Sequence, residues 1–590
     1  MKKIYLYNLL LLLFFNACDS EPEKVEGVPN QDPEFEVFKD YFINELWKIS
    51  PQQAVYAGYY DYAAELPAPS DSLREAQIAF ANRMLDSLHQ YDPASLSPDN
   101  SINYKMIENE LESQRWYITT YQGWKWNPAT YNVAGVFDRI IKSDFAPLAQ
   151  KLEIVFEKME HVPQYYAQAR ENIDRPSVPH TRLAIDQIRG GTYIFENVIL
   201  DSLNAAGISG EQQKEMLATI NETVESINAF ANYLELEVLP ELNGENSRNF
   251  RLGENLYEEK FKYDIVSTYT AKEIYEKARA HKDSLHREMT RISQRLWSKY
   301  FPGQAQPLGL QVVHHMLDTL SSQHSHRDSF MQDIEKQIPR LAEFVREKDL
   351  LYLDPSKPLT VRETPMYMRG IAGASISAPG PYDKDKETFY NVSPLNSPQY
   401  TTASAESFLR EYNDYILQIL NIHEAIPGHY AQLVYSNENP DMIRSILGNG
   451  ATIEGWAVYG ERMMLEAGYG KNAAEMWLMY YKWNLRTTCN TILDYSVHVL
   501  NMTEEQALNL LMNEAFQEEA EARGKWRRVQ LSQVQLTSYF TGYMDIVKLR
   551  QDYQEKMGEE YSLKNFNETF LKYGSAPVKY IREAMLGERE

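Results

Sequence analysis

Residues 422–430 read IHEAIPGHY, and the rest of this 590-residue chain can be interpreted around them. Two histidines, His423 and His429, lie within this stretch. A second segment, TIEGWAVY at residues 452–459, carries Glu454 among apolar neighbours. Because a carboxylate in an apolar setting is costly unless it is paired or binds a metal, we expect Glu454 to act together with the two histidines.

These residue types favour a catalytic zinc site with one Zn²⁺. The expected ligands are His423, His429 and Glu454, since catalytic zinc takes three protein ligands and leaves one position for water. Glu424 would stand beside the ion as general base, because the metal lowers the pKa of water and a carboxylate can then accept its proton. Manganese or cobalt could occupy the same ligands. For residues 422–430 alone, a solvated His-Glu pair is an equal alternative.

The spacing of the two histidines requires an irregular backbone. In the H-E-x-x-H pattern the histidines share one helix face, whereas His429 follows His423 by six residues here. Six residues of regular helix turn through about 240°, which would point the imidazoles apart. Pro427 and Gly428 can supply the deviation, since Pro interrupts helical hydrogen bonding and Gly accepts unusual dihedrals. We expect a helix that ends or bulges near Ile426.

The two segments together resemble a known bacterial family. HEAIPGH followed by EGWAVYGE is similar to the family of domain of unknown function 885 (DUF885), which itself resembles gluzincin-type zinc metallopeptidases. The resemblance covers most of the chain and includes SPQQAVYAG at residues 50–58 and SYFTG at residues 538–542. It implies a mainly α-helical, metallopeptidase-like fold with a small β-sheet beside the cleft, and a peptide substrate.

Two residues near the C-terminus are candidates for stabilising the transition state. Amide hydrolysis needs a donor for the developing oxyanion. In the segment that resembles the family, Arg528 precedes a Q-x-x-S-Y-x-x-G run that contains Tyr539. We assign the donor role to these two residues, with helix packing as the alternative for Tyr539. The chain departs from the family pattern at residues 533–534, QV in place of Pro-Gly, and at Asn567 in place of a His.

A short β-type run, ETFYNV, lies at residues 387–392. In zinc peptidases of similar pattern, a strand edge beside the metal pairs with the substrate main chain. The resemblance therefore makes Tyr390, Asn391 and Val392 candidate substrate contacts through strand addition. A purely structural hairpin is an equal alternative.

The N-terminus is typical of a bacterial lipoprotein. Residues 1–17 combine an early pair of lysines with an apolar run, as in a secretory signal peptide. The following Cys18 resembles a lipoprotein processing site, which implies a lipid anchor and a cell-envelope location; simple secretion is the alternative. Residues 18–33 are expected to be a flexible tether. We expect residues 34–590 to form one large helical domain, which could consist of two lobes on either side of a cleft.

Composition limits the classes of function. A net charge of −24 argues against nucleic-acid binding. Apart from the leader, no apolar run reaches the roughly 18 residues that a transmembrane helix needs. The chain has only two cysteines, and we expect Cys489 to be a buried, inert thiol. The oligomeric state stays open.

Several local features give further expectations. The helix that carries His423 should begin near Thr402, and a second helix at residues 453–465 should present Glu454. Glu461 could hold a ligand histidine, although a solvated side chain is favoured. Asp494 and His498 are expected to form an ion pair within one helix.

The sequence thus predicts a lipid-anchored zinc hydrolase with peptides as substrates. The alternative is a non-catalytic lipoprotein that binds glycans or peptides for an outer-membrane uptake system. Such a binding protein would not need Glu424.

Overall fold

The computed structural model describes residues 30–208, 210–364, 374–383, 387–396 and 400–587. The leader at residues 1–17, Cys18 and most of the tether at residues 18–33 lie outside the described residues. The first helix, α1, begins at Asp32, just before the predicted end of the tether. Among the described residues, no helix is both long and apolar enough to cross a membrane.

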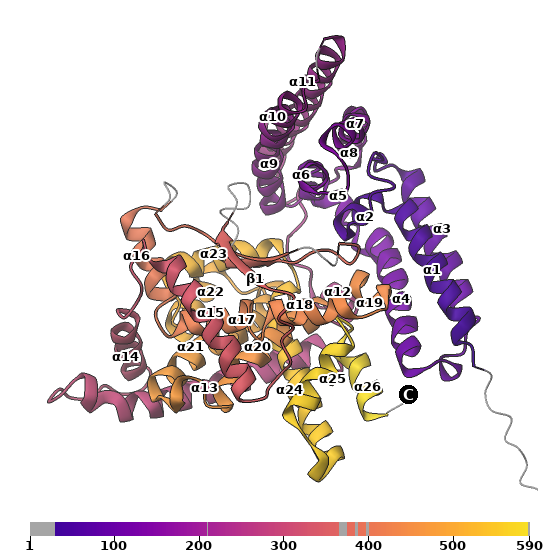
Figure 1. Cartoon of the computed structure of the whole chain (residues 1–590). Helices are drawn as coiled ribbons and strands as arrows, with labels where there is room; N and C mark the ends of the chain where they lie inside the picture. Colours follow the sequence, from indigo (N-terminus) through magenta and orange to yellow (C-terminus); the bar gives the residue numbers. More distant parts are fainter. Residues whose placement is uncertain (1–29, 209, 365–373, 384–386, 397–399, 588–590) are drawn as a thin grey trace, which may run out of the picture.

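The described chain is mainly helical and has a projecting lobe above a larger body (Figure 1). The first helices lie along one side of the molecule: α1 Asp32–Ile49, α2 Pro51–Ala57, α3 Asp71–Leu88 and α4 Pro98–Trp116. The projecting lobe contains α5 Gly123–Trp126, α6 Ala134–Lys142, α7 Leu148–Met159, α8 Val162–Asn172, α9 Val178–Tyr193, α10 Leu200–Ala205 and α11 Glu211–Asn232.

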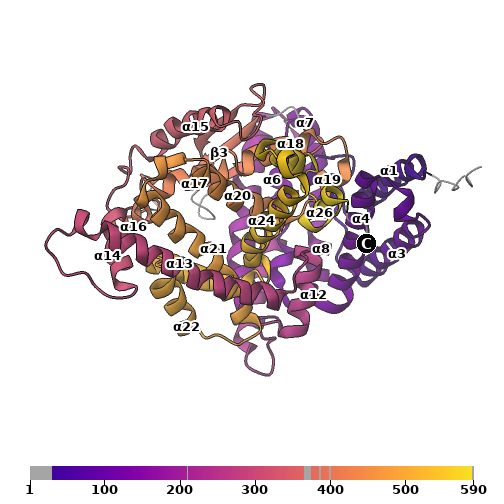
Figure 2. The same ribbon diagram turned by 90° about the horizontal axis from the view of Figure 1, so that it is seen from below.

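The body holds the remaining helices. The first of these are α12 Glu254–Ile265, α13 Ala271–Tyr300, α14 Gln311–Ser321, α15 Phe330–Glu347, α16 Thr402–Glu411, α17 Ile416–Glu424, α18 His429–Glu438 and α19 Met442–Ile446. They are followed by α20 Gly450–Glu466, α21 Ala474–His498, α22 Glu504–Asn509, α23 Glu519–Leu531, α24 Ser538–Met557, α25 Leu563–Lys572 and α26 Val578–Leu586. Figure 2 shows α13 lying across the lower face beside α21.

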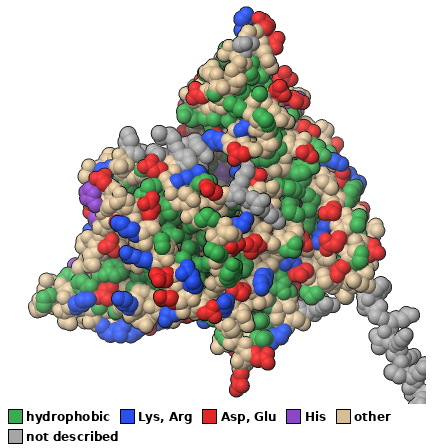
Figure 3. Space-filling model, viewed as in Figure 1, with side chains coloured by type: hydrophobic (Ala, Val, Ile, Leu, Met, Phe, Trp, Pro, Cys, Tyr) green, Lys and Arg blue, Asp and Glu red, His purple; other side chains and the backbone are tan. Residues whose placement is uncertain are grey.

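Buried apolar side chains form two separate cores. The smaller core fills the projecting lobe, mostly from residues 131–239, and the larger core fills the body. Large side chains such as Phe137 and Phe195 are fully buried in the first, and Trp456 and Tyr543 in the second. The surface is hollowed where the lobe meets the body (Figure 3).

Local sequence signals explain several helix starts. Thr270 and Thr503 each form a reciprocal capping box at the start of α13 and α22. Ser50 stands at the N-cap of α2, with Pro51 in the first turn, but its side chain makes no capping hydrogen bond. No capping box therefore forms at Ser50, although the helix itself is present.

A three-stranded sheet lies beside α17, in the order β1-β3-β2. Its strands are β1 Leu359–Glu363, β2 Ala374–Ser377 and β3 Thr388–Val392. β3 is central, because it pairs with β1 in parallel and with β2 in antiparallel register. The main chain of Tyr390, Asn391 and Val392 is thus already paired on both sides. Our prediction that these residues add a substrate strand is wrong, and the edge nearest the cleft belongs to β2.

The helix that leads to His423 is shorter than predicted. Instead of one helix from Thr402, the chain forms α16 and α17 with a break between them. The side chain of Asn413 accepts from the main-chain N–H of Tyr415 and Ile416, at 3.2 and 3.3 Å. Asn competes for main-chain donors in this way, so α17 starts afresh at Ile416.

Candidate metal centre

The two histidines meet because the backbone turns sharply between α17 and α18. α17 ends at Glu424 and α18 starts at His429, and the Ile426–Pro427 peptide is cis. Gly428 packs so tightly that an added Cβ would lie 1.8 Å from the carbonyl oxygen of His423. Only glycine fits this position. The predicted end of the helix near Ile426 is confirmed.

A close helix crossing brings the other half of the site into place. α20 carries Glu454 and crosses α24, which carries Tyr539, at two glycines that face each other. A Cβ on Gly455 would lie 2.3 Å from the carbonyl carbon of Gly542. With no side chain between the backbones, the first turns of both helices are held beside His423.

Three side chains converge with the spacing of a metal coordination shell. Nε2 of His423 and Nε2 of His429 lie 3.6 and 3.4 Å from Oε2 of Glu454, and one ligand atom from each residue lies within 4.8 Å of the others. These separations exceed the usual hydrogen-bond length. Around tetrahedral zinc with bonds near 2.1 Å, two ligand atoms stand about 3.4 Å apart. Oε2 of Glu454 is buried without a hydrogen-bond partner, so the three residues fit a bound cation.

Glu461 fixes the orientation of His423. Its Oε1 accepts from Nδ1 of His423 at 2.7 Å and from Nε1 of Trp483 at 3.0 Å. With Nδ1 engaged, Nε2 is the ring nitrogen that faces Glu454, which is how carboxylates position metal-binding histidines. Glu461 is fully buried, so the favoured expectation of a solvated Glu461 is wrong. The signal for burial was its place seven residues after Glu454 in an apolar helix.

The electrostatics of the centre favour positive charge. Burial alone lowers the pKa of His423, but the adjacent carboxylates of Glu454 and Glu461 overcome this effect and raise that pKa to about 10. Burial alone would raise the pKa of Glu454, yet the imidazoles of His423 and His429 hold it below its usual value. Two buried carboxylates beside two imidazoles are therefore compensated by protons or by a cation.

Glu424 is free to act as a base. Its side chain is half-buried and lines the cleft, and no hydrogen bond or ion pair joins it to any other described residue. Burial raises its pKa, with the carboxylate of Glu454 adding to the effect. A raised pKa brings a carboxylate nearer to the range in which it can take up and release a proton at neutral pH.

Tyr539 lies on α24 and Arg528 on α23. The ring of Tyr539 is nearly parallel to that of His423, with centroids 6.5 Å apart. Nη2 of Arg528 lies 3.4 Å from the Tyr539 hydroxyl and donates to Oε1 of Gln535 at 2.8 Å. Both residues line the same cleft as Glu424. The structure thus brings together all six residues that were predicted as metal ligands, base or oxyanion donors.

Tyr390 and Asn391 support the site rather than face the cleft. The hydroxyl of Tyr390 donates to Oδ1 of Asn421 at 2.8 Å, on the last turn of α17 before His423. Asn391 donates to Oγ of Ser377 at 2.8 Å and accepts from Nε of Arg362 at 2.7 Å. Both side chains are fully buried. They anchor the sheet to the helix that carries His423.

The cleft has a volume of about 850 Å³ and lies between the two cores. Leu183 and Gln187 of α9 border it on the side of the projecting lobe, and Ala374 at the start of β2 borders it on the side of the body. Aromatic and cationic side chains form much of the remaining lining: Phe330, Phe408, Tyr412, Trp483, Arg486 and Lys525.

Comparison with known proteins identifies the family. Residues 51–585 match the family described as "Bacterial protein of unknown function (DUF885)". The chain belongs to the DUF885 family. No curated protein matches this DUF885 chain.

Two solved structures are similar to this DUF885 protein. The first is a protein of unknown function from Shewanella oneidensis, provisionally described as a lipoprotein; it is 49% identical, with a TM-score of 0.86, over 94% of this chain and 99% of its own. The second, a provisional lipoprotein from Colwellia psychrerythraea, is 15% identical with a TM-score of 0.75, over 95% and 99% of the two chains. The second likeness shows a shared fold alone.

The departures from the DUF885 pattern lie outside the ligand set. Val534 adopts a left-handed conformation, with φ of 71°, where the family pattern has Gly. Asp494 holds this turn by accepting from the N–H of Val534 at 2.9 Å and of Leu536 at 3.3 Å. His498 instead bonds the carbonyl of Val529, so the predicted Asp494–His498 ion pair is wrong. Asn567 is buried and bonds the hydroxyl of Tyr459 at 3.1 Å.

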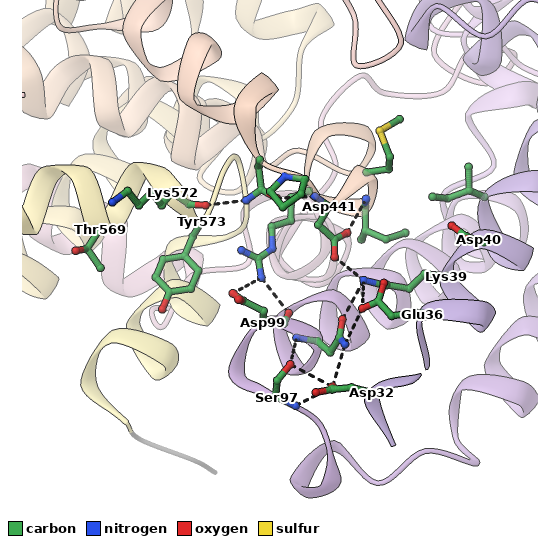
Figure 4. A pocket seen from close by; sticks show the side chains of 17 residues that line it. Asp32, Glu36, Lys39, Asp40, Ser97, Asp99, Asp441, Thr569, Lys572 and Tyr573 are labelled. Carbon is green, nitrogen blue, oxygen red and sulfur yellow. Dashed lines mark hydrogen bonds and ion pairs between the residues drawn. The ribbon is translucent and has the colours of Figure 1, made fainter. Parts of the chain in front are cut away.

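A second hollow of the DUF885 fold, between α1, α4 and α19, has a different character (Figure 4). Its charged side chains point at one another: Nζ of Lys39 bonds Asn100 at 3.0 Å and Asp441 at 2.5 Å. Arg444 bonds Oδ1 of Asp99 at 2.8 Å. These contacts join the N-terminal helices to the body. His423, Glu424 and Tyr539 line the other cleft.

Proposed function

We propose that this DUF885 protein is a zinc-dependent hydrolase that cleaves peptide bonds. The observation that carries the proposal is the set of three ligand atoms at the spacing of a zinc shell, beside the unengaged carboxylate of Glu424. His423, His429 and Glu454 would hold the ion. When bound, the ion supplies a Lewis acid and a water of lowered pKa.

The chain's own groups complete the chemistry. Glu424 accepts the proton of the attacking water and delivers it to the leaving amine, for which its raised pKa is suited. Tyr539 donates a hydrogen bond to the developing oxyanion, and Arg528, in contact with its hydroxyl, keeps that group in place. Glu461 holds His423 in the tautomer that leaves Nε2 available.

The cleft supports a peptide as substrate. Its volume of about 850 Å³ suits a short extended segment. β2 is an edge strand whose first residue, Ala374, lines the cleft, so a substrate strand could pair with it by main-chain hydrogen bonds. The lipoprotein description of the Shewanella relative, together with Ala17-Cys18 after an apolar leader, supports a lipid anchor and a cell-envelope location for this chain.

The test combines metal analysis with one isosteric substitution. Purified protein should contain about one zinc per chain, and a peptide-library digest should show cleavage that stops with a chelator and returns with zinc. Glu424→Gln should lose cleavage by about 100-fold or more while retaining zinc. Glu438→Gln, an exposed acid on α18, is the matched control and should behave as wild type.

One result would favour the alternative of a binding protein. The aromatic lining of the cleft, with Tyr412 and Trp483, would suit glycan or peptide capture as well. If zinc-loaded wild type cleaves nothing, and Glu424→Gln binds peptides or glycans just as wild type does, the hydrolase proposal fails.

A further inference from the structure

Lys525 is a buried cation without a partner in the cleft. It lies on α23, is 4% exposed, and lines the same cleft as Glu424 and Tyr539. No hydrogen bond or ion pair joins it to any other described residue. Buried lysines are normally paired, because an uncompensated charge away from water is costly. Its position therefore needs an explanation that the proposed chemistry does not give.

The neighbouring carboxylates are already engaged by other cations. Oε1 of Glu521 bonds Arg486 at 2.5 Å, and Oε2 of Glu411 bonds Lys482 at 2.8 Å. Both acids are close enough to act on Lys525 electrostatically, as are Arg486 and Arg528.

The local balance is positive. Four cations, Lys482, Arg486, Lys525 and Arg528, surround two carboxylates, Glu411 and Glu521. A surplus of positive charge at this point contrasts with the net charge of −24 of the whole chain. Burial lowers the pKa of Lys525 well below its usual value, and the positive charge of Arg486 lowers it further. The four cations outnumber the two carboxylates by two, so this part of the cleft can accept an anion.

We propose that Lys525, together with Arg486 and Arg528, forms a subsite that binds a carboxylate group of the substrate. A bound anion would pair with Lys525, which has no hydrogen bond or ion pair with any described residue. Charge-assisted hydrogen bonds of this kind are among the strongest. The role of this subsite in cleavage rests on the proposed hydrolase function. Its ability to bind a carboxylate does not depend on hydrolysis.

The position of the subsite limits where the carboxylate lies on the substrate. Arg528 contacts Tyr539, whose ring lies beside His423, and Lys525 precedes Arg528 by three residues of helix. That step is about 4.5 Å along α23, whereas each residue of an extended peptide spans about 3.3 Å. The carboxylate bound there would belong to a residue one or two positions from the cleaved bond.

Two sources could supply such a carboxylate. It could be the α-carboxylate of a peptide C-terminus, in which case the protein trims one or two residues from that end. It could also be the side chain of an Asp or Glu near the cleaved bond. A peptide with a free C-terminus, its C-terminal amide, and an amide with Asp placed near the end distinguish the two sources.

The experiment compares these three peptides on wild type and Lys525→Met. Substitution at Lys525 breaks no bond with any described residue, so the variant should fold, and its melting temperature should be at least that of wild type. Wild type should prefer a carboxylate-bearing peptide over the plain amide by at least about tenfold in kcat/KM, or 1.4 kcal/mol. Lys525→Met should lose that preference through KM, whereas the control Lys272→Met, on the exposed face of α13, should keep it.

Binding measurements separate failure of the subsite from failure of the hydrolase. Calorimetry with short N-acetylated peptides on Glu424→Gln protein should show tighter binding of the free acid than of the amide, and the double variant with Lys525→Met should show no difference. Preference in binding without any cleavage would retain the subsite and reject the hydrolase. Equal binding and equal cleavage of acid and amide peptides by wild type would overturn the subsite alone.

Discussion

Gly428 offers a direct test of the geometry that brings the two histidines together. In Gly428→Ala, the new Cβ would stand 1.8 Å from the carbonyl oxygen of His423, whereas real contacts of this kind are not found below 3.0 Å. The two groups must therefore separate by at least 1.2 Å, the difference between these values. Zinc sites tolerate deviations of about 0.2 Å in their bond lengths. The displacement exceeds that tolerance several-fold and acts on the main chain of a ligand.

We expect Gly428→Ala to weaken zinc binding by more than about 100-fold, beyond the loss typical of removing an outer hydrogen-bond partner. Competition with a chromophoric chelator measures the affinity, and circular dichroism checks that the helices remain. Gly460→Ala is the matched control on α20, because its Cβ would meet Pro427 Cγ at an ordinary 3.6 Å. Wild-type zinc affinity in Gly428→Ala would show that the close packing of Gly428 does not hold the two histidines in place.

Three further predictions concern Glu461, Asp545 and Val534. Glu461→Gln should weaken zinc binding by about 10- to 100-fold, as chelator competition would show, because the amide supports His423 less well; unchanged affinity would contradict this. Burial raises the pKa of Asp545 to about 7 from 3.8, so the folded state binds more protons than the unfolded one between these values, and stability should fall by up to about 4 kcal/mol as pH rises from about 4 to 7. Urea unfolding should show a steeper fall of stability with pH in wild type than in Asp545→Asn, in which Asp494, whose pKa burial raises to about 6, still contributes. Val534 is fully buried at φ of 71°, so Val534→Ala should lower the free energy of unfolding more than Val534→Gly, which relieves about 1–3 kcal/mol of strain; the reverse order in thermal melts would exclude strain there.

The sequence predicted the parts of the site that depend on residue type and local backbone. The irregular turn at Pro427-Gly428 follows from the spacing of the two histidines, and the helix that presents Glu454 follows from its apolar run. The same signals indicate Glu461 only as the less favoured candidate for holding a ligand histidine, because its contact with His423 spans 38 residues of sequence. The sequence pairs Asp494 with a neighbour on its own helix, whereas its partners are the hydroxyl of Tyr257 and main-chain groups of a distant turn.

Strand order was also beyond the sequence. ETFYNV at residues 387–392 was recognised as a strand, but its central place depends on pairing with both β1 and β2. Only the fold shows that Ala374, in a run of small residues, lies at the edge beside the cleft. Likewise, nothing in the spacing of Arg486 and Lys525 indicated that two helices would bring them to the same cavity.

The contact between Gly455 and Gly542 has a consequence for how this centre can change. Glu454 and Tyr539 belong to segments some 85 residues apart in sequence, yet no side chain cushions their helices from each other. A bulkier residue at either glycine would push Glu454 and Tyr539 apart. If Glu454 holds a cation and Tyr539 stabilises the oxyanion, as proposed, any change at this crossing would alter cation affinity and transition-state stabilisation together.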